Sequence, residues 1–269
     1  ICFNKKFGLL KETFLANNSN YNFIYCNDYP LLETSVELKK ISRSKLIYDS
    51  HEIYIETINQ FFPTNGWRSI YGSILIRLNK LIHFKNEQKL LKEVDLFIIV
   101  CNSFLHYFKK KYGIKDGLVI RNCPDLIDFP KKSNRIKEIL NLDDSTKIIL
   151  YQGAINAGRG IEKIIKASNH FNEDIHFVIL GSGPNLEKMK RLSFEERTSK
   201  VHFIDKVPFE DLLDYTASAD AGVMLIEPIN KSKELTLPNK VFEYMAAGIP
   251  VITNNLPEAS EIVKHNNCG

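Results

Sequence analysis

The sequence predicts an α/β fold with two Rossmann-like domains, each built on a doubly wound parallel sheet, facing one another across a cleft. Short apolar segments alternate with helical patterns along the chain, as they do in parallel sheets with crossover helices. One segment, residues 94–100, is almost continuously hydrophobic, which is typical of strands buried on both faces. Residues 122–145 interrupt the alternation with prolines and charged residues, which indicates a crossover between two domains.

The first run of alternation predicts a domain over residues 1–123, followed by an interdomain crossover over residues 124–145. Gly113 follows the last helical pattern of the first domain and is expected to end that helix. The chain opens at Ile1 without an initiator methionine and stops at Gly269 just after a helical pattern. We therefore expect a fragment in which both domains are incomplete. The predicted strands are residues 22–26, 45–49, 94–100 and 117–120, and the predicted helices are residues 31–40, 53–93 with a break at 63–66, and 104–112.

The second domain is predicted over residues 146–269, where the alternation is clearer. A glycine-bearing loop, residues 153–160, follows its first strand, and a second loop, residues 181–184, follows the next strand and precedes a polar helix. The predicted strands are residues 147–151, 175–180, 201–204 and 221–226, and further helices are predicted at residues 161–169 and 209–219.

Residues 235–253 predict a turn, a short helix and a buried strand. Pro238 and Asn239 mark the start of the helix, with Asn239 as a plausible N-cap. Gly248 is placed to end the helix in a left-handed conformation, and Pro250 prevents its continuation.

The short helix carries a carboxylate and an ammonium group in its first turn. At about 100° per residue, Lys240 and Glu243 share a face that lies opposite Val241 and Tyr244. This arrangement fits either an ordinary ion pair on a surface helix or part of a binding site.

The composition is that of a globular chain. Hydrophobic residues make up 44% of the sequence and charged residues 25%, which excludes wholesale disorder. No apolar run reaches the roughly 18 residues that span a bilayer. The five cysteines are scattered without metal-ligand spacing, which favours reduced thiols in a cytoplasmic protein.

Charge is distributed unevenly along the chain. Residues 1–145 contain 22 basic and 16 acidic residues, whereas residues 146–269 contain 14 and 16. The basic first part fits contact with an anionic membrane, with anionic substrates, or merely a lysine-rich composition. No basic motif interleaved with aromatic residues and no zinc spacing is present, so we expect no nucleic-acid partner.

Four segments that could carry chemistry follow predicted strands, at the sheet edge where doubly wound domains bind ligands. They are residues 50–52, 153–160, 181–184 and the loop before Asn239. Their common location is stronger support for a site than any one of the four motifs.

Arg159 lies between two glycines directly before a predicted helix. Its guanidinium and the free N–H groups nearby suit a diphosphate, although a flexible loop with a solvated arginine would look the same. Gly181 and Gly183 fit a similar role or a plain turn. His51 follows a buried strand and can donate to a sugar hydroxyl or to developing charge, although a lone histidine is more often structural. Glu52 could orient His51 or cap the next helix.

An ordered series of motifs resembles the retaining glycosyltransferases of family 4, also called glycosyl transferases group 1, and in particular a bacterial subgroup. The resemblance covers most of the chain and implies the GT-B fold, with two Rossmann-like domains. The motifs are residues 48–52, 119–122, 151–160, 181–184, 201–203, 219–220, 237–252 and 261–263.

The resemblance assigns roles by position. Glu243 would hydrogen-bond the ribose hydroxyls of a sugar nucleotide, Arg159 would contact the diphosphate, and the backbone near Phe203 and Val207 would edge the nucleobase. His51 would lie near the donor sugar and the reaction centre, as the candidate catalytic residue. The candidate donor-binding residues are Gly153, Arg159, Gly181, Gly183, Phe203, Val207, Pro238, Asn239, Lys240 and Glu243.

Two positions depart from the family pattern. Leu235 stands where the first glutamate of the family's Glu-x7-Glu motif is expected, and Glu234 is one residue away. Ala154 replaces the usual arginine after the first strand of the second domain, so that Lys240 is our candidate for the missing cation. The chain also contains no Asp-x-Asp, the usual metal–diphosphate handle, so we expect no metal and no other cofactor.

The implied activity is transfer of a sugar from a nucleotide-sugar donor to a glycan or lipid-linked acceptor, with retention of anomeric configuration. We expect a cytoplasmic, metal-independent hexosyltransferase of cell-surface polysaccharide biosynthesis, in possible peripheral contact with the inner face of the membrane. Two alternatives remain: a GT-B-fold nucleotide-sugar isomerase of the 2-epimerase kind, and a non-catalytic nucleotide-sugar-binding subunit.

Overall fold

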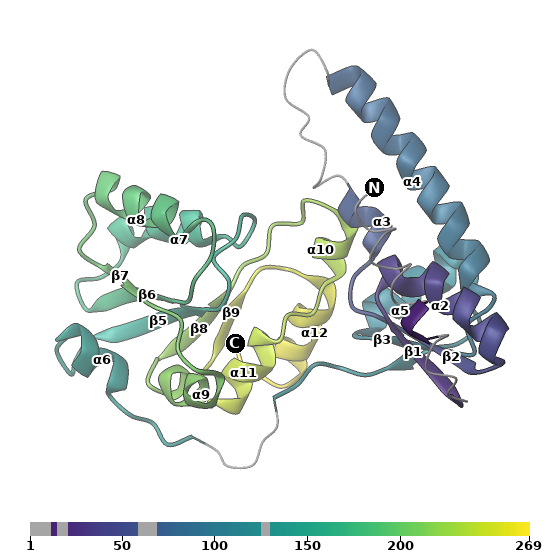
Figure 1. Cartoon of the computed structure of the whole chain (residues 1–269). Coiled ribbons are helices and arrows are strands. Elements are labelled where there is room, and N and C mark those ends of the chain that lie inside the picture. Colours follow the sequence, from purple (N-terminus) through teal and green to yellow (C-terminus); the bar gives the residue numbers. More distant parts are fainter. Residues whose placement is uncertain (1–11, 15–20, 59–68, 125–129) are drawn as a thin grey trace. The chain divides into compact units, whose positions relative to one another are not determined.

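A computed structural model describes residues 12–14, 21–58, 69–124 and 130–269 (Figure 1), with the side chains of helix α4 described from residue 73 onward. The chain divides into two compact units. Unit 1 comprises Ile1–Arg121 with Asn230–Ser232, and unit 2 comprises Asn122–Ile229 with Lys233–Gly269. Each unit contains one parallel sheet, which confirms the predicted α/β class with two parallel sheets.

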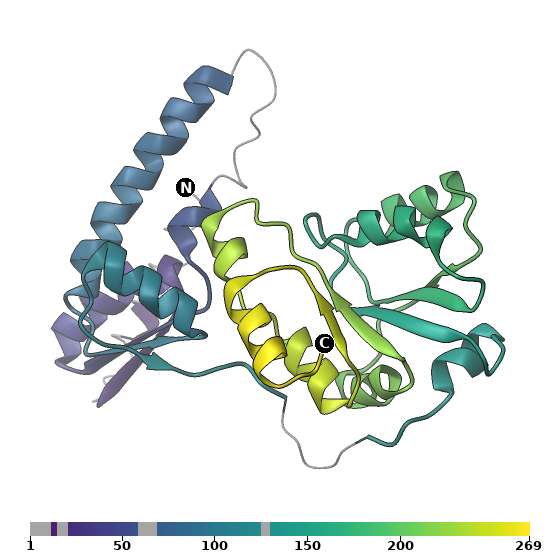
Figure 2. The same ribbon diagram turned by 180° about the vertical axis from the view of Figure 1, so that it is seen from behind.

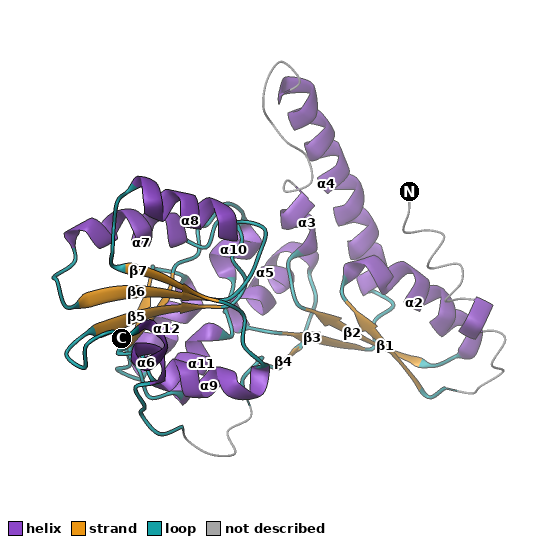
Figure 3. Ribbon diagram, turned by 60° about the vertical axis from the view of Figure 1, so that its left-hand side comes forward, coloured by secondary structure: helices purple, strands orange, loops and turns teal. Residues whose placement is uncertain are grey.

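The strands of unit 1 lie in the order of the chain. Helix α2 packs on β1 and β2, helix α5 packs on β3, and helix α4 runs beside α2 and α3 (Figure 3). As predicted, α5 ends at Gly113, which has a φ of 71°. The break predicted at residues 63–66 lies outside the described residues. The strands are β1 (Phe23–Asn27), β2 (Lys45–Ser50), β3 (Leu96–Ile99) and β4 (Leu118–Val119), and the helices are α2 (Tyr29–Ser42), α3 (Tyr54–Thr57), α4 (Ser69–Leu91) and α5 (Asn102–Tyr112).

The sheet of unit 2 has the order β7-β6-β5-β8-β9, so that the strand order reverses between β5 and β8. Helices α7 and α8 cover one face, and α9, α11 and α12 cover the other (Figures 1 and 2). The strands are β5 (Lys147–Gln152), β6 (Ile175–Leu180), β7 (Val201–Ile204), β8 (Ala221–Met224) and β9 (Val251–Thr253). The helices are α6 (Arg135–Leu140), α7 (Ile161–Ala167), α8 (Leu186–Glu195), α9 (Phe209–Ala217), α10 (Lys231–Leu235), α11 (Lys240–Ala246) and α12 (Pro257–His265).

The sequence patterns located these elements well but not always their ends. The region predicted only as a crossover, residues 122–145, contains the short helix α6. The helix predicted over residues 161–169 passes into a 3₁₀ turn, Ser168–His170, after α7. Strand β8 ends at Met224 rather than at residue 226. Helix α6 was thus missed altogether, whereas the other two differences concern element ends, which depend on hydrogen bonding that periodicity does not encode.

Alternate residues of the unit 2 strands build the core. Phe177 and Ile179 of β6 point to the same face, where they pack with Ile161 and Ile165 of α7 and with Met189 of α8. These side chains are almost fully buried. This core holds β5 and β6 in place, and the carboxyl end of β5 lies at the point where the strand order reverses.

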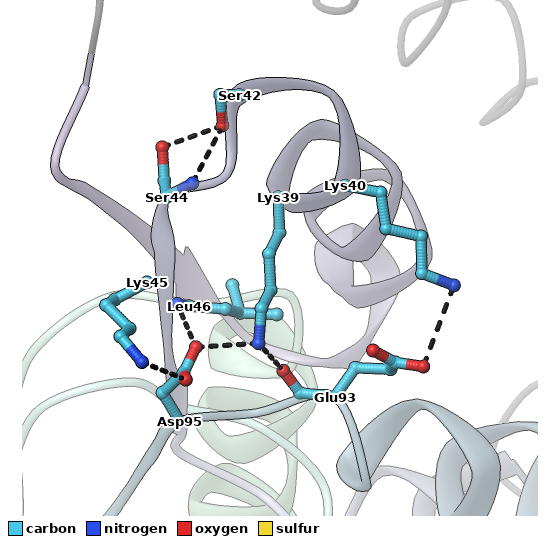
Figure 4. Close-up of polar contacts among 8 residues, drawn as sticks. All are labelled: Lys39, Lys40, Ser42, Ser44, Lys45, Leu46, Glu93 and Asp95. Atoms are coloured by element: carbon cyan, nitrogen blue, oxygen red, sulfur yellow. Dashed lines mark hydrogen bonds and ion pairs between the residues drawn. The ribbon is translucent and has the colours of Figure 1, made fainter.

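Both units start a central strand with the same device. In unit 1 Asp95 accepts a hydrogen bond from the Leu46 N–H at 2.8 Å, while its own N–H donates to the Leu46 carbonyl at 2.9 Å. Its carboxylate also forms ion pairs with Lys39 and Lys45 at 2.7 Å and 3.2 Å (Figure 4). Desolvation opposes ionisation, but the hydrogen bonds from Lys39, Leu46 and Lys45 prevail and lower the pKa of Asp95 to about 2.

In unit 2, Asp220 repeats these contacts. It accepts from the Ile148 N–H and donates to the Ile148 carbonyl, both at 2.9 Å, and pairs with Lys132 and Lys147. Asp95 directly precedes β3 and Asp220 directly precedes β8, each after a small apolar residue (Val or Ala). The two units therefore start a parallel strand with the same set of hydrogen bonds to the neighbouring strand.

Candidate functional site

A chain of buried side chains ends at Glu243. Gln152, the last residue of β5, is fully buried, and its Nε2 donates to Glu243 Oε2 at 2.5 Å. Its Oε1 accepts from Thr216 Oγ1, on α9, at 2.7 Å. The carboxylate of Glu243 is therefore linked through Gln152 of β5 to α9, which lies on the same face of the sheet as α11. Sequence reasoning missed both Gln152 and Thr216, because neither stands out by type or spacing.

Helix α11 is anchored to the sheet by Tyr244. This fully buried side chain donates from its hydroxyl to the carbonyls of Leu150 and Val223, at 3.2 Å each. Its ring lies against Gly222, where a Cβ atom would come within 2.3 Å of the ring. This contact brings the first turn of α11, with Lys240 and Glu243, to the carboxyl end of β5.

Lys240 lies over an aromatic ring. Its Nζ is 3.6 Å from the centroid of Tyr151, and a Cβ at Gly153 would be 3.1 Å from its Cε. Desolvation, reinforced by the positive charge of Arg159 and opposed by Glu243, lowers the pKa of Lys240 to about 7. Within the described residues no ion pair joins Lys240 to Glu243, so the first turn of α11 does not carry the ordinary surface pair considered above.

Arg159 lies on the loop between β5 and α7. Its neighbours Gly158 and Gly160 have φ values of 74° and 69°, a left-handed conformation that glycine adopts without strain. The side chain is partly exposed. Among the described residues it forms no hydrogen bond or ion pair, although its charge acts on Lys240 and on Tyr151. Two cationic groups and one carboxylate thus come together at the end of β5.

The other glycines of the predicted site have a packing role. The Ile155 N–H donates to the Ser182 carbonyl at 2.9 Å, so that the loops after β5 and β6 meet backbone to backbone. A Cβ at Gly181 would lie 2.0 Å from the Gly153 carbonyl oxygen, and one at Gly183 would lie 2.5 Å from the Ile155 oxygen. This close contact requires glycine at both positions whether or not a ligand binds there.

The remaining predicted residues of unit 2 are distributed around the same sheet. Phe203 is in β7, where it packs against the core, and Val207 lies in the loop that follows. Pro238 and Asn239 immediately precede α11. Asn239 stands at the predicted N-cap position and its carbonyl accepts from the Glu243 N–H, but its side chain makes no capping hydrogen bond. That part of the prediction was wrong, because Asn239 itself has helical backbone angles.

His51 belongs to unit 1, directly after β2. Its Nε2 is 3.2 Å from Asp49 Oδ2, and the Tyr25 hydroxyl donates to the same carboxylate oxygen. The His51 N–H donates to Asp28 Oδ1 at 2.9 Å. The sequence suggested Glu52 as the partner that orients His51, whereas the structure shows Asp49 at the ring. Asp49 and His51 are two residues apart on the strand end, a spacing that could have pointed to this pair.

The two positions that depart from the family pattern lie in unit 2. The Ala154 carbonyl accepts from the Tyr151 hydroxyl at 2.7 Å. Leu235 is the last residue of α10, which also contains Glu234. In the part of the chain that the structure describes, no three His, Cys, Asp or Glu side chains form a group that could hold a metal ion. No helix within these residues is long and apolar enough to cross a membrane.

Comparison with known proteins agrees with this architecture. The family model described as glycosyl transferases group 1 matches residues 132–269, just over half of the chain. An uncharacterized glycosyltransferase of Methanocaldococcus jannaschii is 25% identical over 264 residues, 97% of this chain and 63% of that protein. The chitobiosyldiphosphodolichol beta-mannosyltransferase of Candida albicans is 24% identical over 228 residues, 74% of this chain and 48% of that protein.

The solved structures that resemble the chain include GT-B glycosyltransferases. The Anabaena protein Alr3699/HepE in complex with UDP-glucose has a TM-score of 0.66 and 17% identity, covering 97% of this chain and 65% of that one. At this identity the likeness shows the fold alone. The chain spans about half to two thirds of the length of these three proteins.

Proposed function

The chain belongs to the glycosyl transferases group 1 family, and from this premise we propose that it transfers a sugar from a nucleotide-sugar donor to a glycan or lipid-linked acceptor. The observation that carries the proposal is the meeting of Glu243, Lys240 and Arg159 at the carboxyl end of β5. A carboxylate beside two cationic groups is complementary to a ribose joined to a diphosphate.

In this proposal Glu243 accepts hydrogen bonds from the ribose hydroxyls. Gln152 already holds one of its carboxylate oxygens at 2.5 Å. The carboxylate is thus oriented before the donor arrives, which lowers the entropy lost on binding. The backbone near Phe203 and Val207 lines the nucleobase. Pro238 and Asn239 form the loop that leads into α11 on the donor side.

Arg159 and Lys240 bind the diphosphate. The planar guanidinium can make two parallel hydrogen bonds to phosphate oxygens, while the ammonium acts as a compact charge. In this proposal Lys240 supplies the positive charge that the family's arginine would supply at the position of Ala154. The backbone at Gly153, Gly181 and Gly183 lies close by without side chains. Because the chain contains no Asp-x-Asp, we propose that these groups, and not a metal, stabilise the leaving diphosphate.

We further propose that the reaction retains the anomeric configuration, as in family 4, by front-face attack assisted by the leaving phosphate. His51, held by Asp49 at 3.2 Å, is the candidate that donates to the donor sugar near the reaction centre. The proposed setting is a bacterial cell, in the cytoplasm or at the inner face of its membrane, in cell-surface polysaccharide biosynthesis. The lipid-linked acceptor named for the Candida albicans relative supports an acceptor of that class.

The test is a donor screen by thermal shift and saturation-transfer NMR with common nucleotide sugars, followed by assay of nucleoside diphosphate release with candidate acceptors. We expect one donor to stabilise the protein and to release its nucleotide only when an acceptor is present. Product NMR then compares the anomeric configuration of product and donor. If no donor binds and none is consumed, the proposal fails.

The alternatives give different results in the same experiment. A nucleotide-sugar isomerase would convert its donor without any acceptor. A binding subunit, which Leu235 and Ala154 favour, would bind a donor and release nothing with any acceptor. His51→Ala is expected to abolish release while the donor still binds, and unchanged release would assign the chemistry to another residue.

A further inference from the structure

Helix α4 has an exposed apolar face. Five aliphatic side chains between residues 74 and 82 are between 49% and 63% exposed, a high value for leucine and isoleucine. At about 100° per residue they fall within a sector about 120° wide. The five are Ile74, Leu75, Leu78, Leu81 and Ile82; together they form the outer face of α4.

A different face of the same helix packs against unit 1. Ile76, Glu87 and Leu90 are buried, and Lys80 Nζ pairs with Glu56 Oε2 of α3 at 2.9 Å. The helix begins well beyond the layer formed by α2 and the sheet of unit 1 (Figures 1 and 3). An ordinary surface helix is apolar on one face and polar on the other, so a helix that is apolar on two faces implies a partner for the second.

Basic side chains surround and continue the outer face. Lys85 and Lys89 fall in the same angular sector over the next two turns, Arg77 lies at its border, and Lys92 follows the helix. All four are exposed, and within the described residues none of them forms an ion pair. The only acidic residue of α4, Glu87, is buried on the packed face. The outer face therefore consists of apolar side chains, and every charged side chain next to it is positive.

We propose that the outer face of α4 docks on an anionic lipid bilayer. The aliphatic side chains would lie at the boundary between headgroups and acyl chains, and Lys85 and Lys89 would reach the lipid phosphates with their long stems. The charge selects this partner over a second copy of the chain, because a symmetric contact would bring the same unpaired cations together without an acid to offset them. This docking does not depend on the glycosyl transfer proposed above.

The proposal is tested by flotation of the protein with vesicles of phosphatidylcholine and phosphatidylglycerol in equal parts, and with vesicles of phosphatidylcholine alone. We expect binding to the anionic vesicles that weakens as salt is raised. The double variant Leu78→Glu/Ile82→Glu is expected to reduce the bound fraction by about tenfold or more, since it places two charges in the apolar face. Phe194→Glu, at an 84% exposed position on α8, is the matched control and should bind like the parent protein.

A second variant tests the charges without altering the apolar face. Lys85→Gln/Lys89→Gln is expected to weaken anionic-vesicle binding and to reduce its salt dependence, with an unchanged melting temperature. Equal binding to both kinds of vesicle, or full binding by the Glu double variant, would overturn the proposal. So would a concentration-dependent dimer in light scattering that the Glu double variant abolishes, because the face would then bind a second copy. Donor binding by thermal shift, measured on the same variants, should be unchanged.

Discussion

The side chain of Gln152 connects two helices through the central strand of unit 2. It takes a hydrogen bond from Thr216 and gives one to Glu243, and it is fully buried. A primary amide carries a donor and an acceptor group without a charge, so Gln152 can accept from Thr216 and donate to Glu243 at the same time. Glu243 can thus be the residue that touches ligand while Gln152 positions it.

We predict that Gln152→Ala lowers donor affinity by about tenfold and the free energy of unfolding by about 1–3 kcal/mol, because it removes the hydrogen bonds of a fully buried amide to Glu243 and Thr216 and leaves a cavity in its place. Isothermal titration with the donor and urea unfolding measure the two effects. Thr216→Val is the matched control, because it removes the hydrogen bond from Thr216 to Gln152 but keeps the one from Gln152 to Glu243. Donor affinity that is unchanged in Gln152→Ala would show that Glu243 needs no such support.

The lowered pKa of Lys240 makes donor binding depend on pH. Its pKa is lowered to about 7 in the absence of donor, and a bound diphosphate favours the charged form and raises that pKa. Donor affinity should therefore decrease as the pH rises above about 7, with a proton taken up on binding. Calorimetry in buffers of different ionisation enthalpy measures this uptake. Lys240→Met should bind more weakly and without uptake; the same uptake in this variant would assign the proton elsewhere.

Helix α11 owes its position to one tyrosine and one glycine. Tyr244 reaches carbonyls on β5 and β8, and Gly222 leaves room for its ring. The helix is only two turns long, so its own hydrogen bonds would not hold it in solution. Tertiary packing therefore places Lys240 and Glu243.

We predict that Gly222→Ala displaces α11, costing about 1–3 kcal/mol of stability by overpacking and weakening donor binding as well. Gly248→Ala is the control at the other end of α11. It has a φ of 69° and open space around its Cβ position, so it should cost about 1 kcal/mol through backbone strain and leave donor affinity intact. Thermal unfolding and donor titration of both variants give the comparison. Equal effects on affinity would contradict it.

Helix α4 carries a buried acid on its packed face. Glu87 accepts hydrogen bonds from the hydroxyls of Tyr48 and Tyr112. Burial dominates over these bonds and raises the pKa of Glu87 to about 7. Between its ordinary value of 4.5 and about 7 the folded state holds a proton that the unfolded state has released.

The contribution of Glu87 to the free energy of unfolding of unit 1 should therefore be largest below about pH 4.5. Up to about 3 kcal/mol of that free energy should be lost as the pH rises through 7. Glu87→Gln removes the titration and keeps the side-chain shape. We expect the difference in unfolding free energy between the two proteins to change in this pH window, as measured by urea unfolding with hydrogen exchange to localise it to unit 1. A difference that is constant with pH would mean that Glu87 is ionised in the fold.

The two units repeat one way of starting parallel strands. Asp95 in unit 1 and Asp220 in unit 2 each exchange two hydrogen bonds with the second residue of the neighbouring strand and each pair with two lysines. Since each device serves its own sheet, their contributions to stability should be independent.

We predict that Asp95→Asn and Asp220→Asn each cost about 1 kcal/mol, a modest value because the ion pairs are partly exposed. The double variant should show the sum of the two losses. Hydrogen exchange should report weaker amide protection in β2 and β3 for the first variant, and in β5 and β8 for the second. A loss that spreads to the other sheet would contradict this independence.

Much of the fold could be read in advance. The alternation of apolar strands with helices and the ends of α5 and α11 at Gly113 and Gly248 are local features, and the structure confirmed them. The common location of residues 153–160, 181–184 and the start of α11 at carboxyl ends of strands followed from the rules of parallel sheets. Element ends and the side-chain cap of Asn239 were less predictable, since they depend on competing hydrogen bonds.

By itself the sequence determined the class of fold, the order of its elements and the residue types available for chemistry, because periodicity and turn residues act over a few positions. Only the tertiary structure decided how those residues are paired. Gln152 and Glu243, which are hydrogen-bonded, are 91 positions apart in the sequence. The ring of His51 contacts Asp49, although Glu52 is its neighbour in the chain. Lys240 lies on the ring of Tyr151 rather than beside Glu243. Such pairings arise when separate elements pack on one sheet, and no local pattern encodes them.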